Sequence, residues 1–158
     1  MRSRVSTCLW FDDNGEEAAT FYMSLFPNSR IVSVSRYGEG GMMPKGLAML
    51  TRFELDGASF AALNGGPHFK LSEAASIVAL CDTQGEIDRL WSALTADGGA
   101  ESQCGWLKDR FGLSWQIVPA MLDEVMSDKD PARTGRVMAA IMTMVKIDIA
   151  AIGKAYKE

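Results

Sequence analysis

The segment that decides the fold is NGEEAATFYMSLF, residues 14–26. It begins with Asn14, a residue type that caps helices, and Glu17 three residues later completes the pattern of a capping box. The apolar residues that follow share the spacing of one helix face, and they are Ala18, Phe21, Tyr22, Leu25 and Phe26. The segment therefore predicts an amphipathic helix. The apolar run at residues 8–11 predicts a strand that leads into it.

The same pattern recurs 69 residues further along the chain, in TQGEIDRLWSALT, residues 83–95. Thr83 and Glu86 repeat the capping box. The positions that correspond to Ala18, Phe21, Tyr22 and Leu25 are again apolar, and they are Ile87, Leu90, Trp91 and Leu94. A strand precedes each helix and further strands follow each one, so we interpret the chain as two βαβββ modules of an α+β protein. The alternative is a coincidence between two amphipathic helices. It explains the shared capping boxes and flanking strands less well than an internal repeat does.

The other strands are expected from short apolar or alternating runs bounded by turn residues. The expected strands cover residues 31–35, 47–55, 59–63, 76–81, 105–107 and 114–118. Asp56-Gly57 predicts a tight hairpin, and a strand between Gly99 and Gln103 is expected to be weak or absent. Residues 38–46 contain four glycines, which predicts a mobile loop that gates a binding site.

A helical tail follows the second module. Helices are expected over residues 121–126, from Asp130-Pro131 onward, and over 147–155, because proline suits the first position of a helix. The tail is rich in methionine, which favours core packing, with a dimer contact as the alternative. The expected boundaries are about 4–66 for module one, 74–119 for module two and 120–158 for the tail, within a single domain of residues 1–158.

Composition excludes several classes of protein. The chain has 158 residues, 47% hydrophobic and 23% charged, with a net charge of −4. This balance argues against a nucleic-acid partner, which would require a basic face. No apolar run approaches the ~20 residues of a membrane helix, and the start of the chain lacks the apolar stretch of a signal peptide. Three cysteines without a CxxC pair favour reduced thiols, so a cytoplasmic location is expected.

Several residues are candidates for chemistry. His68 follows a strand and is interpreted either as an acid or base at the mouth of a cleft or as a loop histidine with no role. Cys8 and Cys81 are expected to be buried thiols and Cys104 more exposed, with no base to activate a cysteine nucleophile.

The most polar and aromatic segment holds Trp106, Lys108, Asp109, Trp115 and Gln116. Strand alternation places Trp115 and Gln116 on opposite faces of a sheet, so only one of them can face a cleft. Lys108 and Asp109 have the simpler interpretation of a hairpin ion pair.

Three segments together resemble a known family. They lie at residues 8–22, at 62–67 (ALNGGP) and at 105–119, where GWLKD leads into GLSWQIVP. The chain resembles the PhnB-like branch of the vicinal oxygen chelate superfamily, also called the glyoxalase/bleomycin resistance/dioxygenase superfamily. Members of this branch often carry the label 3-demethylubiquinone-9 3-methyltransferase domain. The resemblance implies paired βαβββ modules that curve round a cleft, and a homodimer that often exchanges modules.

The resemblance also raises the question of a metal. Superfamily enzymes commonly hold one divalent metal through His, Gln or Glu at four strand positions, which match Thr7, Asn64, Ser76 and Gln116 here. None of these is a histidine or a carboxylate, and neutral oxygens hold a transition metal poorly. We therefore expect a polar cleft with no metal and no cofactor. Position-matching favours Gln116 over Trp115 as the residue that faces the cleft. The predicted ligand-binding residues are Thr7, Asn64, His68, Ser76, Trp106 and Gln116, and no catalytic residue is assigned.

The leading hypothesis for function is a small-molecule-binding protein that pairs with itself. The alternatives are a metal-assisted lyase, isomerase or dioxygenase, the methyltransferase of the family label, and a dimerisation module without a ligand. The common S-adenosylmethionine site requires a parallel sheet and a glycine-rich turn after its first strand. The turn that follows residue 11 has no such pattern.

Overall fold

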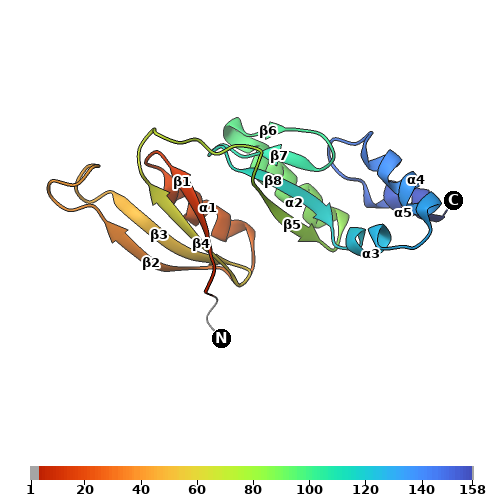
Figure 1. Ribbon diagram of the computed structural model, residues 1–158, viewed down its shortest axis with the longest axis horizontal. Helices are drawn as coiled ribbons and strands as arrows, with labels where there is room; N and C mark the ends of the chain where they lie inside the picture. The colour runs from red at the N-terminus through yellow and green to blue at the C-terminus, as the bar shows by residue number, and fades with distance from the viewer. Residues whose placement is uncertain (1–3, 158) are drawn as a thin grey trace. The chain divides into compact units, whose positions relative to one another are not determined.

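The computed structural model describes residues 4–157 and divides the chain into two compact units, residues 1–71 and 72–158 (Figure 1). Each unit contains a four-stranded sheet and a helix in the order βαβββ, and helices follow in the second unit. The α+β fold with two βαβββ modules and a C-terminal helical tail is therefore confirmed. The elements of the first unit are β1 Thr7–Phe11, α1 Gly15–Leu25, β2 Arg30–Arg36, β3 Ala48–Leu55 and β4 Ala58–Asn64.

The first sheet has the strand order β1-β4-β3-β2, in which only β1 and β4 are parallel. Helix α1 covers one face, where Phe11 and Ala62 lie against its first residue, Gly15. The core on this side also contains Tyr22 and Phe53, both buried. We call the other side, which α1 leaves uncovered, the open face of the first sheet.

Two local features shape this sheet. Asp56 and Gly57 both have positive φ, at 43° and 81°, which is the backbone of a two-residue hairpin turn. The hairpin predicted at this dipeptide is confirmed. In β2, the register with β3 shifts between Ile31 and Ser33. Val32 is 53% exposed, because the extra residue of a bulge is not paired and interrupts the alternation of side chains between the two faces.

The start of α1 differs from the prediction. The Asn14 side chain makes no capping hydrogen bond, so the capping box with Glu17 does not form. Asn64 at the end of β4 replaces it, because its Oδ1 accepts from the Gly15 N–H at 2.8 Å. The Asn64 Nδ2 donates to the carbonyls of Asp13 and Ala48 at 3.0 and 2.9 Å. A side chain 49 residues distant in sequence thus caps this helix.

The second unit repeats the arrangement with a sheet of order β5-β8-β7-β6, in which only β5 and β8 are parallel. Its elements are β5 Ser76–Cys81, α2 Gln84–Thr95, the 3₁₀ turn η1 Ala96–Gly98, β6 Ala100–Glu101, β7 Trp106–Lys108, β8 Ser114–Pro119, α3 Leu122–Met126, α4 Pro131–Ile141 and α5 Ile149–Lys157. Strand β6, which was expected to be weak or absent, is present and has two residues. The predicted capping box of Thr83 and Glu86 and the buried face of α2 are confirmed.

The turn between β7 and β8 is organised by one carboxylate. Asp109 is buried, and its side chain accepts from the backbone N–H groups of Phe111 and Leu113 at 2.9 and 3.0 Å. It also accepts from the Trp115 Nε1–H at 2.8 Å. Lys108, whose simpler interpretation was an ion pair with Asp109, pairs with Glu73.

The helical tail packs within the second unit. The Gln84 side chain donates to the Ile147 carbonyl and accepts from the Ile149 N–H, at 3.0 and 2.9 Å. Gly105 N–H donates to the Val145 carbonyl at 2.8 Å. Ile147 and Ile152 are fully buried, so the tail contributes apolar core, whereas Met138 and Met142 are exposed.

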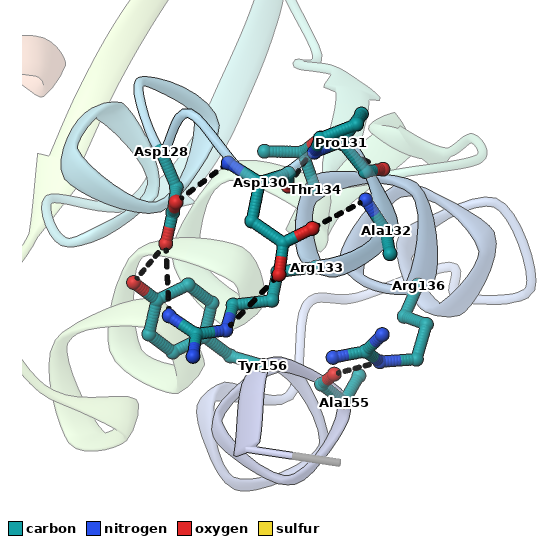
Figure 2. A network of polar contacts seen from close by, with 9 residues as sticks. All are labelled: Asp128, Asp130, Pro131, Ala132, Arg133, Thr134, Arg136, Ala155 and Tyr156. Atoms are coloured by element: carbon teal, nitrogen blue, oxygen red, sulfur yellow. Dashed lines mark hydrogen bonds and ion pairs between the residues drawn. The ribbon is translucent and has the colours of Figure 1, made fainter.

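A polar network joins the start of α4 to α5 (Figure 2). Tyr156 Oη donates to Asp128 Oδ2 at 2.6 Å, and Arg133 lies within ion-pair distance of both Asp128 and Asp130. The hydrogen bond from Tyr156 holds the pKa of the Asp128 carboxyl below its ordinary value and raises the pKa of Tyr156. Asp130 caps α4 by accepting from the Ala132 N–H, as the Asp130-Pro131 pair predicted. Among residues 4–157, no helix is long and apolar enough to cross a membrane.

Candidate functional site

The strand registers show which positions of the two sheets correspond. Phe11 ends β1 opposite Asn64, and Cys81 ends β5 opposite Pro119. Both Phe11 and Cys81 are buried. Phe11 lies three residues before Asn14, whereas Cys81 lies two residues before Thr83. The helices therefore correspond at a spacing of 69 residues and the first strands at a spacing of 70.

This one-residue difference changes which residues of the first sheet match the ligand positions of the superfamily. Side chains alternate between the two faces of a strand, so a shift of one residue transfers a position to the other face. Thr7 shares the face of the buried Leu9 and Phe11, which is the side that α1 covers. The residue that corresponds to Ser76 is Ser6. By the same registers, the residue that corresponds to Gln116 is Ala61.

Thr7 and Asn64 do not come together. They lie at opposite ends of the β1–β4 pair, because Thr7 is opposite Phe60 and Asn64 is opposite Phe11. Four residues of strand separate these ends by about 13 Å. Asn64 is 1% exposed, and its amide is occupied by the three hydrogen bonds that hold the start of α1. Asn64 thus positions the start of α1 against the sheet of the first unit.

Three predicted site residues do share one surface, the side of the second sheet that α2 does not cover. We call it the open face of the second sheet. Gln116 Nε2 donates to Ser76 Oγ at 2.9 Å, and Trp106 lies opposite Gln116 on the neighbouring strand. All three side chains are partly exposed. Trp115 is fully buried on the other side, as expected for a neighbour of Gln116 on the same strand.

The same face carries an unsatisfied hydroxyl. Ser114 lies opposite Ser76 in the parallel register and opposite Lys108 in the antiparallel one. Its Oγ is buried and has no hydrogen-bond partner within the described part of the chain. A buried hydroxyl without a partner is unfavourable by about 1–3 kcal/mol. The open face therefore holds a hydrogen-bonding group that the protein itself does not use.

The open face of the first sheet contains a pocket of about 520 Å³. The residues that line it include two serines, two arginines and one alanine, namely Ser6, Ser59, Arg4, Arg52 and Ala61. None of these five residues was predicted as a site residue. Strand alternation was unreadable at residues 8–11, because all four are apolar, so the sequence did not show which face β1 presents.

The remaining predicted site residue, His68, lies in the loop after β4 and is exposed. The next residue, Phe69, contacts Trp10 edge to face, with ring centroids 4.9 Å apart. Trp10 Nε1 donates to the Gly66 carbonyl at 2.9 Å. These contacts fix the loop against β1, and within residues 4–157 no hydrogen bond to His68 is present. Its task as an acid or base stays a prediction, as does gating by residues 38–46.

The three cysteines are unpaired, and they differ in exposure. Cys81 is buried, and burial raises the pKa of its thiol to about 11, which keeps it protonated and unreactive at neutral pH. Cys8 was expected to be buried as well, but it is exposed, because it alternates with Leu9 and Phe11. Cys104 is half-buried and has a positive φ of 60°.

The residues present do not fit the metal that the superfamily commonly binds. The register gives Ser6 and Ala61 in the first sheet and Ser76 and Gln116 in the second as corresponding positions. Two hydroxyls, one amide and one methyl group are a poor ligand set for a divalent transition metal. Within the range 4–157, no three His, Cys, Asp or Glu side chains gather into a group that could hold a metal ion.

The paired βαβββ modules define the fold of the glyoxalase/bleomycin resistance proteins, and comparisons with known proteins show the family. The profile of the family described as 3-demethylubiquinone-9 3-methyltransferase matches residues 3–118. A solved PhnB protein from Bacillus cereus is 35% identical, with a TM-score of 0.70, over 75% of this chain and 100% of that one. The chain belongs to this PhnB-like family. Helices α3 to α5 follow the matched residues.

More distant structures share the fold. The Pseudomonas aeruginosa protein PA1353 is 22% identical, with a TM-score of 0.62, over 75% of this chain and 98% of that one. The fosfomycin resistance protein FosX from Mesorhizobium loti is 16% identical, with a TM-score of 0.56, over 81% of this chain and 99% of that one. A search of the curated proteins finds no match.

Proposed function

We propose that this PhnB-like protein binds a small molecule on the open face of its second sheet, without a tightly held metal. The observation that carries the proposal is the shared placement of Ser76, Trp106 and Gln116 there. An indole ring offers a flat apolar contact, and an amide with two hydroxyls offers donors and acceptors. This mixture of one aromatic wall with few polar groups is typical of small-molecule sites.

The buried hydroxyl of Ser114 supports the same proposal. A ligand oxygen or nitrogen that reaches this group would supply the partner that it lacks. Lys108, on the other side of Ser114, is held by Glu73, so its charge is compensated. The face is therefore suited to a neutral polar ligand with a planar part.

The test uses the indole N–H signals of a ¹⁵N-labelled sample, because the four tryptophans give four separate probes. A panel of metabolite-sized planar compounds, including short-chain quinones, is titrated into the protein. A ligand on this face is expected to shift the Trp106 signal and leave that of Trp115, which faces the core, unchanged. Gln116→Ala is expected to weaken the response about tenfold, the usual scale for loss of a polar contact. Failure of every compound to shift Trp106 would contradict the proposal.

The alternative functions are enzymatic. A methyltransferase is expected to bind S-adenosylmethionine, which calorimetry measures directly. The sheets offer little support for it, because each contains only one parallel pair, whereas the common cofactor site uses a parallel sheet with a glycine-rich turn. Metal-assisted chemistry is tested by native mass spectrometry after addition of divalent metals, because an enzyme of that kind is expected to retain one metal per site.

We further propose that the chain forms a homodimer in the cytoplasm. The apolar side chains of Val78 and Leu80 on the edge strand β5 are 51% and 58% exposed, and exposed apolar groups on a sheet favour association. Three unpaired thiols suit a reducing compartment. Light scattering coupled to gel filtration tests the dimer, and a monomeric mass at micromolar concentration would contradict it.

A further inference from the structure

The pocket on the open face of the first sheet has an unusual charge arrangement. Among its lining residues, Arg4 and Arg52 are exposed, and within residues 4–157 neither side chain forms an ion pair or a hydrogen bond. The other two arginines of this sheet are both engaged. Arg30 pairs with Glu54 at 2.8 Å and Arg36 pairs with Glu16 at 2.7 Å. Among the arginines of this unit that the structure describes, Arg4 and Arg52 are thus the two whose side chains have no acidic partner.

The one carboxylate in the lining is already neutralised. Glu54 accepts from Arg30, and this hydrogen bond lowers the pKa of Glu54 and raises that of Arg30. The pair contributes no net charge, so the positive charges of Arg4 and Arg52 remain. The hydroxyls of Ser6 and Ser59 add donors without charge. Guanidinium groups with nearby hydroxyls are the donors that recognise carboxylate and phosphate oxygens.

The space for a ligand comes from Ala61. At the corresponding place in the second sheet, Gln116 fills the surface and bonds to Ser76. Ala61 has only a methyl group, and it lies opposite Arg52 on the neighbouring strand. The bulge at Val32 adds an apolar wall on one side. The first sheet therefore has a pocket beside the methyl group of Ala61, at the position where the second sheet carries the amide of Gln116.

We propose that this pocket binds the oxyanion group, a carboxylate, phosphate or phosphonate, of a small ligand. Arg52 is the main donor, Arg4 adds a second positive charge, and the two serine hydroxyls complete the set. This inference goes beyond the function proposed above, because it assigns a ligand class to a different sheet. The two can fail separately, since the residues tested are different.

The test is a titration of ¹⁵N-labelled full chain with inorganic phosphate, methylphosphonate and acetate in chloride buffer, followed by amide chemical shifts. Saturable shifts at Arg52, Ser59 and Ala61 are expected for at least one anion. The dissociation constant is expected to rise about tenfold in Arg52→Gln, because a charge-assisted contact is lost. Arg52→Lys keeps the positive charge but loses the planar guanidinium group with its paired donors, so a smaller rise in the dissociation constant is expected. Higher salt is expected to weaken binding.

Arg36→Gln is the matched control, because it removes the same charge from the same sheet outside the pocket. Its dissociation constant is expected to equal that of the wild type. Absence of saturable binding for all three anions would overturn the proposal. Equal weakening in Arg36→Gln and Arg52→Gln would also overturn it, because binding would then reflect overall charge. Both substitutions lie at exposed positions, and the amide spectrum of each variant shows whether the fold is retained.

Discussion

The two modules place their helices alike and differ most on the faces that the helices leave open. By register, Ser6 and Ser59 of the first sheet correspond to Ser76 and Ser114 of the second. The hydroxyl pair is thus repeated. Beside it, Arg52 and Ala61 stand where the second sheet has Trp106 and Gln116. Two copies of the same module therefore present different groups, a charged pocket in the first sheet and an aromatic ring with an amide in the second.

The largest expected contrast is the reactivity of Cys8 and Cys81. Cys8 is on the open side of β1, whereas Cys81 faces the core. At pH 8, alkylation of Cys81 is expected to be at least about a thousandfold slower, because it requires opening of the second unit. Mass spectrometry of peptides after timed iodoacetamide pulses measures both rates. Similar rates for the two thiols would contradict the face assigned to β1.

The same thiol predicts a dependence of stability on pH. The pKa of Cys81 is about 11 in the folded protein, above its ordinary value of 9.0. The folded state therefore keeps a proton that the unfolded state loses, and stability is expected to fall as pH rises from about 9 towards 11. Thermal unfolding of the wild type and of Cys81→Ala isolates this contribution. An identical pH dependence in the two proteins would contradict it.

The two hairpins offer the next contrast. Asp109 accepts three hydrogen bonds in its buried turn, whereas the Asp56-Gly57 turn relies on backbone geometry. Asp109→Asn is expected to destabilise the second unit by about 3 kcal/mol, because an amide donor would face an N–H donor. Asp56→Asn is the matched control, expected to be neutral, since asparagine tolerates positive φ. Hydrogen exchange in β4 and β8 reports each unit separately, and equal effects would contradict the assignment.

The helix caps give a smaller contrast. Asn64→Ala is expected to destabilise the first unit by about 2 kcal/mol, because it leaves the Gly15 N–H and two carbonyls without partners. Thr83→Ala removes a local cap and is expected to destabilise the second unit by about 1 kcal/mol. Urea titration with hydrogen exchange in α1 and α2 measures both. A larger loss for Thr83→Ala would show that the long-range cap is the weaker one.

The fold was readable from sequence because its signals are local. Capping residues, apolar spacing and the Asp56-Gly57 turn act within a few residues, and they predicted the elements and the repeat correctly. The cap of α1 was missed because Asn64 is distant in sequence. The first-sheet residues Thr7 and Asn64 were matched incorrectly, because one extra residue between β1 and α1 places the corresponding side chains on the other face of the sheet. The second-sheet residues Ser76, Trp106 and Gln116 did come together, because their strands alternate clearly around buried Ala79 and Trp115.

Exchanging the residues that distinguish the two faces is expected to have the smallest effect on stability. Ala61→Gln fills the pocket, and Gln116→Ala removes the contact to Ser76, each with a change of at most about 1 kcal/mol, because Ala61 borders the pocket and Gln116 is only partly buried. Ala61→Gln is nevertheless expected to abolish phosphate binding, while Gln116→Ala leaves it unchanged. The titration described above measures both, and undiminished binding in Ala61→Gln would place the anion elsewhere.

We propose that the open faces bind ligands through hydroxyl, amide and guanidinium groups and not through a metal. Native mass spectrometry of the purified full chain, after addition of Ni²⁺, Zn²⁺, Mn²⁺ or Fe²⁺ and buffer exchange, tests this proposal. We expect no metal to be retained in a fixed ratio to the chain. One metal per chain, retained by the wild type and lost in Gln116→Ala, would contradict the claim.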